Sequence, residues 1–126
     1  MICTLHYRSF VDVDDLALNE CTVHAAQHDG ARWWHLWFHV ARDSDGQPDT
    51  FVVPVNPGGP FRPDGPGGKT WSLRRSGPDT WQISPSINVL DTREVHPGFH
   101  SSLSLWHQTP TIVGVPGSER WTTDVP

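Results

Sequence analysis

Positive charge is scarce in this sequence. Lysine occurs once, and nine Lys and Arg residues stand against 14 Asp and Glu residues, which gives a net charge of −5. No stretch gathers basic side chains into a stripe, and this argues against a protein that tracks nucleic-acid phosphates. An acidic balance suits solubility or a partner with a basic surface. We therefore do not expect nucleic acid as the partner.

Long apolar runs and cysteine motifs are also missing. No run approaches the roughly 20 apolar residues of a membrane span. The N-terminal Met-Ile-Cys-Thr-Leu-His-Tyr-Arg lacks the basic, apolar and small-residue regions of a signal peptide. We expect a cytoplasmic protein with no membrane partner. Cys3 and Cys21 form no CxxC motif and are expected to be free thiols in that compartment.

Glycine and proline, in contrast, are abundant. Together they make 23 of the 126 residues, and most fall between Gln47 and Pro85 or after His96. This composition excludes a helical bundle and favours many short strands separated by turns. The length predicts one β-rich domain over residues 1–126. Within it we expect a long Gly/Pro-rich loop at 56–69, without regular structure, and a tail at 116–126.

The most apolar stretch runs from Ala31 to Val40 and reads Ala-Arg-Trp-Trp-His-Leu-Trp-Phe-His-Val. As a helix it would spread aromatic residues around the whole circumference and leave no polar face. Trp and Phe favour the pleated surface of a sheet. Read as a strand of period two, it has an apolar face and an aromatic–histidine face. The apolar face holds Trp34, Leu36, Phe38 and Val40, and the aromatic–histidine face holds Trp33, His35, Trp37 and His39.

The dipeptide Asp29-Gly30 lies between this stretch and a second alternating segment, which is a strong signal for a β-hairpin. A two-residue turn fixes the register, so that His24 opposes His35 and Glu20 opposes His39. Val23 then meets Leu36 on the apolar face. A slip by one residue would mix the two faces, so the pattern itself supports this pairing.

An alternative for the first half of this segment is a helix over residues 14–28. It would place Cys21, His24 and His28 on one stripe at metal-ligand spacing. Residues such as Thr22 and Val23 are poor helix formers, although Gly30 would suit a helix end. The strand is the favoured interpretation.

The rest of the chain alternates between short apolar segments and turns. A short helical turn at Leu16–Leu18, capped by Asp14, is expected after the first strand. Pro54 suggests an edge strand or a bulge, and Pro85 interrupts a strand. The pattern predicts an all-β fold, an antiparallel sandwich or partly open barrel. Strands are expected at Cys3–Val11, Thr50–Val55, Thr70–Arg75, Thr80–Leu90, Ser102–His107 and Thr111–Val115.

One motif is familiar from other proteins. The segment Thr80-Trp-Gln-Ile-Ser-Pro-Ser-Ile-Asn, followed by a His-containing strand that ends near Trp106, resembles small uncharacterised proteins of phages and prophages. The stretch from Trp34 to His39 is similar to the strand that precedes a cysteine-rich metal knuckle in some of them. After His39 this chain continues without cysteine, so the knuckle is absent. The resemblance implies a phage-type accessory protein and carries over no catalytic residue.

The aromatic–histidine face is the predicted binding surface, because it is too polar for a core and too aromatic for a plain solvent-exposed strand. It comprises Trp33, His35, Trp37 and His39, with His24 from the paired strand and the 56–69 loop. We expect a non-catalytic protein without a cofactor that binds a protein partner in the host cell. A homo-oligomeric structural module using the same face is one alternative. For each Trp the competing interpretation is burial under a second sheet.

Histidine is frequent, with eight residues, and its neutral ring binds zinc. His24 and His35 would lie side by side in the hairpin, while His96, His100 and His107 could converge around the Pro97-Gly98 turn. A His-ligated zinc protein, including a metal-dependent hydrolase, is therefore a further alternative. Motifs for other chemistries are missing: Ser84-Pro85-Ser86 lacks the Gly-x-Ser-x-Gly elbow. Gly68-Lys69-Thr70 copies only the end of a phosphate loop.

Overall fold

A computed structural model describes the backbone of residues 2–28, 30–65, 68–96 and 99–116. It describes their side chains except those of residues 2, 28, 31, 32, 91–96 and 99–103. Strands make up 65% of the structure, and the one helical element in the described part is a 3₁₀ turn, η1 (Val13–Asp15). The strands are β1 (Ile2–Tyr7), β2 (Glu20–His28), β3 (Ala31–Ala41), β4 (Pro48–Pro57), β5 (Arg62–Gly65), β6 (Gly68–Arg75), β7 (Trp81–Ser84), β8 (Ile87–His96) and β9 (Phe99–Val113).

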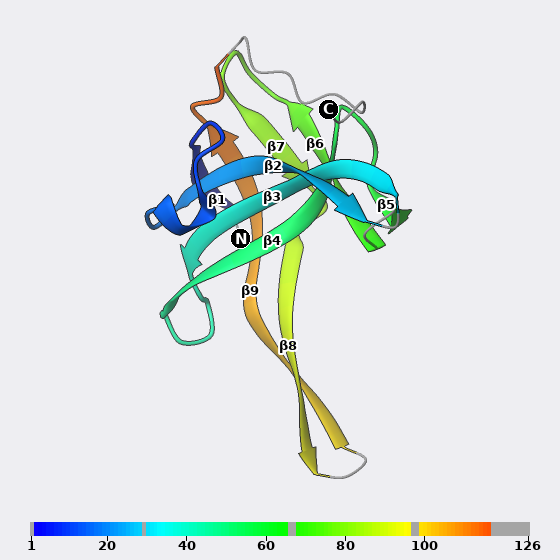
Figure 1. The fold of residues 1–126 in the computed structure, drawn as a ribbon. Coiled ribbons are helices and arrows are strands. Elements are labelled where there is room, and N and C mark those ends of the chain that lie inside the picture. The colour runs from blue at the N-terminus through cyan, green and yellow to red at the C-terminus, as the bar shows by residue number, and fades with distance from the viewer. Residues whose placement is uncertain (1, 29, 66–67, 97–98, 117–126) are drawn as a thin grey trace.

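Seven of these strands close into a barrel (Figure 1). The order is β1-β2-β3-β4-β6-β7-β9, and pairing of β1 with β9 completes the ring. β5 adds to β6, and β8 adds to β9. The predicted all-β sandwich or barrel fold is confirmed, and the barrel is closed rather than partly open. Three ladders, β1–β2, β1–β9 and β4–β6, are parallel, which alternation along single strands does not reveal.

The β2–β3 hairpin has the predicted register. His24 pairs with His35, Glu20 with His39 and Val23 with Leu36. The strand interpretation of residues 20–28 is therefore confirmed, and the helix alternative over 14–28 is wrong. Pairing along the whole length of a long, apolar β3 buries far more surface than an isolated helix of poor helix formers would.

One face of every barrel strand supplies the core. Phe38 lies at its centre, with ring centroids 4.9 Å from Trp106 and 5.8 Å from Phe51. Such tilted aromatic pairs fill the barrel with few, large side chains. The predicted apolar face of β3 is entirely buried. Other core members are Leu5, Tyr7, Cys21, Val23, Val53, Val55, Leu73, Trp81, Ile83, Ile87 and Ile112.

Several local predictions need correction. The first strand ends at Tyr7 rather than Val11, because the chain there leaves the barrel for a loop, residues 8–19. Its helical turn is η1, capped by the Asp12 side chain, which accepts the Asp14 N–H at 3.1 Å. The 56–69 segment is not wholly irregular, since β5 pairs with β6 inside it. Backbone pairing with a neighbour overrides the local Gly/Pro signal there.

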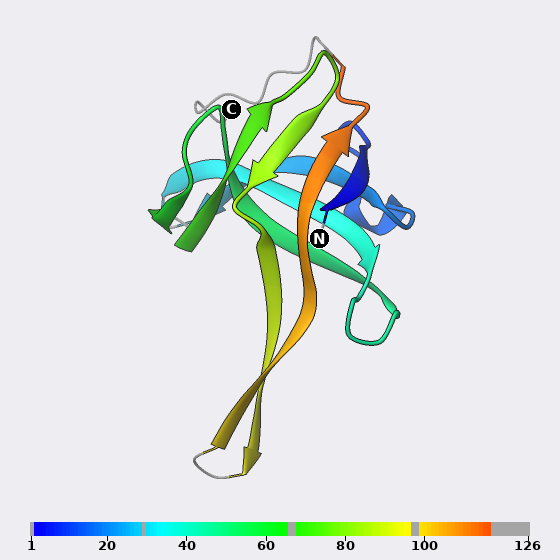
Figure 2. The same cartoon turned by 180° about the vertical axis from the view of Figure 1, so that it is seen from behind.

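The C-terminal third also differs from its predicted outline. A single strand, β9, replaces the two that were expected over 102–107 and 111–115. The predicted break at Pro85 is present, between β7 and β8, with a cis Ser84–Pro85 bond. The β8–β9 hairpin leaves the barrel as an arm, seen from both sides in Figures 1 and 2. Most of the predicted tail, residues 117–126, lies outside the described part.

Candidate binding face

The predicted binding residues lie on the outside of the barrel. His24 on β2 and the alternate residues of β3 share one side of the sheet, opposite the core. Across β4, Pro54 pairs with His35 and Val52 pairs with Trp37. We name the outward side of β2, β3 and β4 the outer face. It consists of His24, Trp33, His35, Trp37, His39, Val52 and Pro54.

Three aromatic rings form a row along β3 on this face. The His35 ring is 5.8 Å from Trp33 and 6.4 Å from Trp37 between centroids, and both contacts are edge-to-face. Trp33 is only 7% exposed, so this end of the row is closed to a partner. His35 and Trp37 are half-buried. Their edge-to-face contacts hold the rings in fixed positions while part of each remains in solvent.

The 8–19 loop covers another part of the outer face. The His24 Nε2–H donates to the carbonyl oxygen of Val11 at 2.8 Å, and the Phe10 ring lies edge-to-face with His24. The Asn19 N–H donates to the carbonyl of His39 at 2.7 Å. Thr22 shares this side with His24, yet it is completely buried, so the loop must lie over it.

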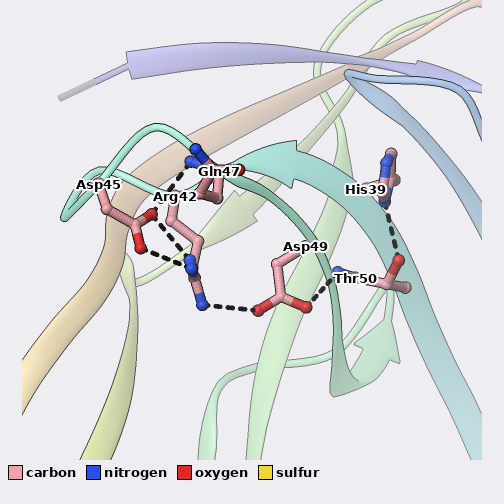
Figure 3. A network of polar contacts seen from close by, with 6 residues as sticks. All are labelled: His39, Arg42, Asp45, Gln47, Asp49 and Thr50. Carbon is pink, nitrogen blue, oxygen red and sulfur yellow. Dashed lines mark hydrogen bonds and ion pairs between the residues drawn. The ribbon is translucent and has the colours of Figure 1, made fainter.

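A polar network fixes the other end of the face (Figure 3). His39 Nδ1 is 2.8 Å from the Thr50 hydroxyl, and the Thr50 N–H donates to the side chain of Asp49. Asp49 is 3.5 Å from Arg42, which also binds Asp45 in the turn between β3 and β4. His39 is therefore held in a structural network at the edge of the outer face.

One exposed apolar residue adjoins the outer face and another belongs to it. Phe10 is 55% exposed and has φ of +48°, an unusual conformation for a bulky side chain. Val52, next to Trp37, is 40% exposed. The sequence does not indicate that Phe10 is an exposed residue beside the outer face, because Phe10 falls within the predicted strand Cys3–Val11. The alternation of β4 contained the signal for Val52, which points away from buried Phe51 and Val53.

The predicted metal ligands do not form one site in the described part of the chain. No group of three or more His, Cys, Asp or Glu side chains suited to a metal ion occurs among the described residues. His24 and His35 are paired neighbours, and His24 uses Nε2 for Val11. His107 is on β9, with Nε2 at 3.2 Å from the Ser86 hydroxyl. The side chains of His96 and His100 lie outside the described ones.

The Ser86–His107 contact has the spacing of a nucleophile and base, but its surroundings are those of a structural joint. The nearby carboxylate of Asp43 accepts from the His107 backbone N–H at 2.8 Å. The same carboxylate accepts from the Gln108 amide at 3.0 Å, and the Asp43 N–H donates to Leu105. Asp43 therefore ties the β3–β4 turn to the root of the arm. In a catalytic triad such a carboxylate orients the His ring, whereas here the Asp43 carboxylate binds the backbone N–H of His107.

Both cysteines are free thiols, as predicted. Burial, followed by the nearby Asp43 charge, raises the pKa of the Cys3 thiol from 9.0 to about 11. Burial in the core raises the pKa of Cys21 as well. Both groups stay protonated at neutral pH, and a protonated thiol is a poor nucleophile and metal ligand.

Comparison with known proteins gives no further guide. No family model, curated protein sequence or solved structure matches the chain. The described part of the chain contains no helix with the length and apolar character to span a membrane. Its function is therefore inferred from its own residues.

Proposed function

We propose that this protein is a non-catalytic binding module that engages a protein partner through the outer face. The observation that carries the proposal is the half-buried ring pair of His35 and Trp37, next to exposed Val52. Trp is enriched among residues that dominate binding energy, and partly exposed apolar surface gains free energy when a partner removes it from water. The resemblance to phage and prophage proteins makes a host protein the first partner class to test.

The scaffold supports such a role. The core packs on one side of β2–β4, and the outer face is centred on β3, which is paired with β2 on one flank and with β4 on the other over most of its length. A rigid surface loses little conformational entropy on binding. Trp37 projects away from this core, so its removal should weaken binding more than it weakens folding.

Site-specific photo-crosslinking in the producing cells tests the proposal. A photoreactive residue at Val52 should give one reproducible cross-linked protein, whereas the same residue at exposed Gln82 on β7 should not. The Trp37→Ala variant should lose this product and retain the circular dichroism spectrum and thermal transition of the parent. Identical products at both positions would contradict the proposal. Global unfolding of Trp37→Ala would instead assign Trp37 to the core.

A homo-oligomeric module is the second candidate, and the arm is the observation that favours it. Within the part of the chain that the structure describes, β8 pairs with β9 alone. A two-stranded ribbon is marginally stable by itself in water, so a second copy packed along the arm would stabilise it. Replacing residues 93–101 by Asn-Gly would join the paired residues Thr92 and Ser102 with a tight turn. Light scattering should then show a dimer or larger assembly for the parent and a monomer for the shortened variant; a monomeric parent would refute this candidate.

A further inference from the structure

Acidic residues are concentrated beside the outer face. Between Arg8 and Arg32 the sequence holds five Asp or Glu residues and no Lys or Arg. Three of them, Asp12, Asp14 and Asp15, lie in and just before η1 and are exposed. The long-range field of such a segment attracts positive charge.

Local hydrogen bonds fix where these carboxylates lie. The Asp12 side chain accepts the Asp14 N–H, and the Asp15 N–H donates to the Asp12 carbonyl at 2.9 Å. The Asp12 carboxylate thus caps and stabilises the turn. Glu20 is neutralised by Arg8, 3.0 Å away, and accepts the N–H of Ala17. Asp14 and Asp15 remain as the exposed charges of the turn that these bonds hold in place.

An exposed aromatic ring belongs to the same loop. Phe10 precedes the turn, and its contact with His24 joins it to the outer face. Phe10 has a φ of +48°, a strained conformation for a bulky side chain, and its ring is 55% exposed to water. The face of an aromatic ring attracts Lys and Arg, and nearby carboxylates add to that attraction.

We propose that the 8–19 loop extends the outer face into a docking surface for a basic segment of the partner. An Arg or Lys side chain lies against the Phe10 ring, and the carboxylates of Asp14 and Asp15 neutralise neighbouring positive charges. This inference rests on the proposed function and specifies the chemistry of the partner. The overall net charge of −5 supports the same polarity over longer range.

A peptide titration tests the inference directly. The probe is a fluorescein-labelled decapeptide of alternating Arg and Gly, with alternating Glu and Gly as its acidic counterpart, followed by anisotropy at low salt. The parent should bind the Arg peptide alone. Asp14→Asn with Asp15→Asn should weaken binding about tenfold, the effect of two surface charge pairs of about 0.7 kcal/mol each. Phe10→Ala should weaken it about threefold to fivefold, and Phe10→Tyr should restore binding.

A matched charge control separates this surface from non-specific attraction. Asp64→Asn with Asp79→Asn changes the net charge by the same amount at exposed sites elsewhere on the barrel. That variant should bind the Arg peptide within about twofold of the parent. Equal losses in the two double variants, or unchanged binding by Phe10→Ala, would overturn the inference.

Failure of this inference and failure of the proposed function have different signatures. A partner cross-linked at Val52 that still binds the Asp14→Asn, Asp15→Asn variant at full strength would refute the basic segment and leave the binding face in place. Cross-linking to a second copy of the chain, with no effect of the Asp14 and Asp15 changes on assembly, would also refute it. The absence of any cross-linked protein when the photoreactive residue stands at Val52 of the parent would refute the proposed function.

Discussion

The buried hydroxyl of Thr22 allows a sharp test of how the outer face is covered. Thr22 is completely buried, and its Oγ1 has no hydrogen-bond partner. Leaving a buried hydroxyl unpaired costs about 1–3 kcal/mol, whereas a methyl group of the same shape has no such cost. We expect Thr22→Val to raise the free energy of unfolding by about 1 kcal/mol, the lower end of that range. For a domain of this size that is a rise in Tm of about 3–5 °C.

Thr50 provides the matched control, because it lies on the same side of the sheet with its hydroxyl 2.8 Å from His39. Thr50→Val makes the same chemical change and removes a hydrogen bond, so it should lower the free energy of unfolding by about 1 kcal/mol. Any gain in strand propensity from Val is common to both variants. The two should therefore differ by about 2 kcal/mol in urea denaturation.

The result that would refute this reasoning is a loss of stability in Thr22→Val as large as that in Thr50→Val. The Thr22 hydroxyl would then have a hydrogen-bond partner in solution, and the 8–19 loop would not exclude water from the sheet beneath it. Hydrogen exchange of the Leu16 and Asn19 amides would report independently on whether that loop opens.

Other consequences concern the core, the thiols and metal. Phe38→Ala should lower the free energy of unfolding by about 3–5 kcal/mol in guanidinium denaturation, because it leaves a cavity where the Phe38 ring packs against Trp106. A loss below about 1 kcal/mol would contradict this packing. Cys3 should react slowly with a thiol reagent at pH 8 and faster toward its pKa of about 11. The Cys3 thiol ionises at a lower pH in the unfolded chain than in the folded protein. Its contribution to the free energy of unfolding is therefore complete below pH 9.0 and is lost as the pH rises to about 11. A Cys3→Ser variant whose stability falls with alkaline pH in the same way would contradict this. Protein purified without a His tag should hold far less than one zinc per chain; a stoichiometric ion lost in His24→Gln would establish the zinc alternative.

The most accurate sequence-based prediction concerned the β2–β3 hairpin. Asp29-Gly30 and the strict alternation on both sides set the register that places His24 opposite His35. Such information is local, because a two-residue turn leaves no freedom in the pairing of the strands it joins. The division of β3 into a buried face and an outward face followed from the same alternation.

The solvent exposure of individual outward residues could not be predicted in this way. Trp33 and Trp37 share one face of β3, yet Trp33 is 7% exposed and Trp37 is half-buried. Period two states which side a residue occupies and says nothing about what covers that side. The 8–19 loop, which buries Thr22 and presents Phe10, carries no periodic pattern that indicates this position, and its first residues were predicted as part of a strand.

The amino-acid sequence by itself determined the all-β class, the hairpin register, the apolar side of β3 and the free thiols. These depend on composition and on contacts between residues close in the chain. The tertiary structure alone decided the parallel closure of β1 on β9, the separation of His107 from the β2–β3 hairpin, and the joint that Asp43 makes with β9. Such pairings depend on which distant segments gain most by burying each other, and a local pattern cannot specify that choice.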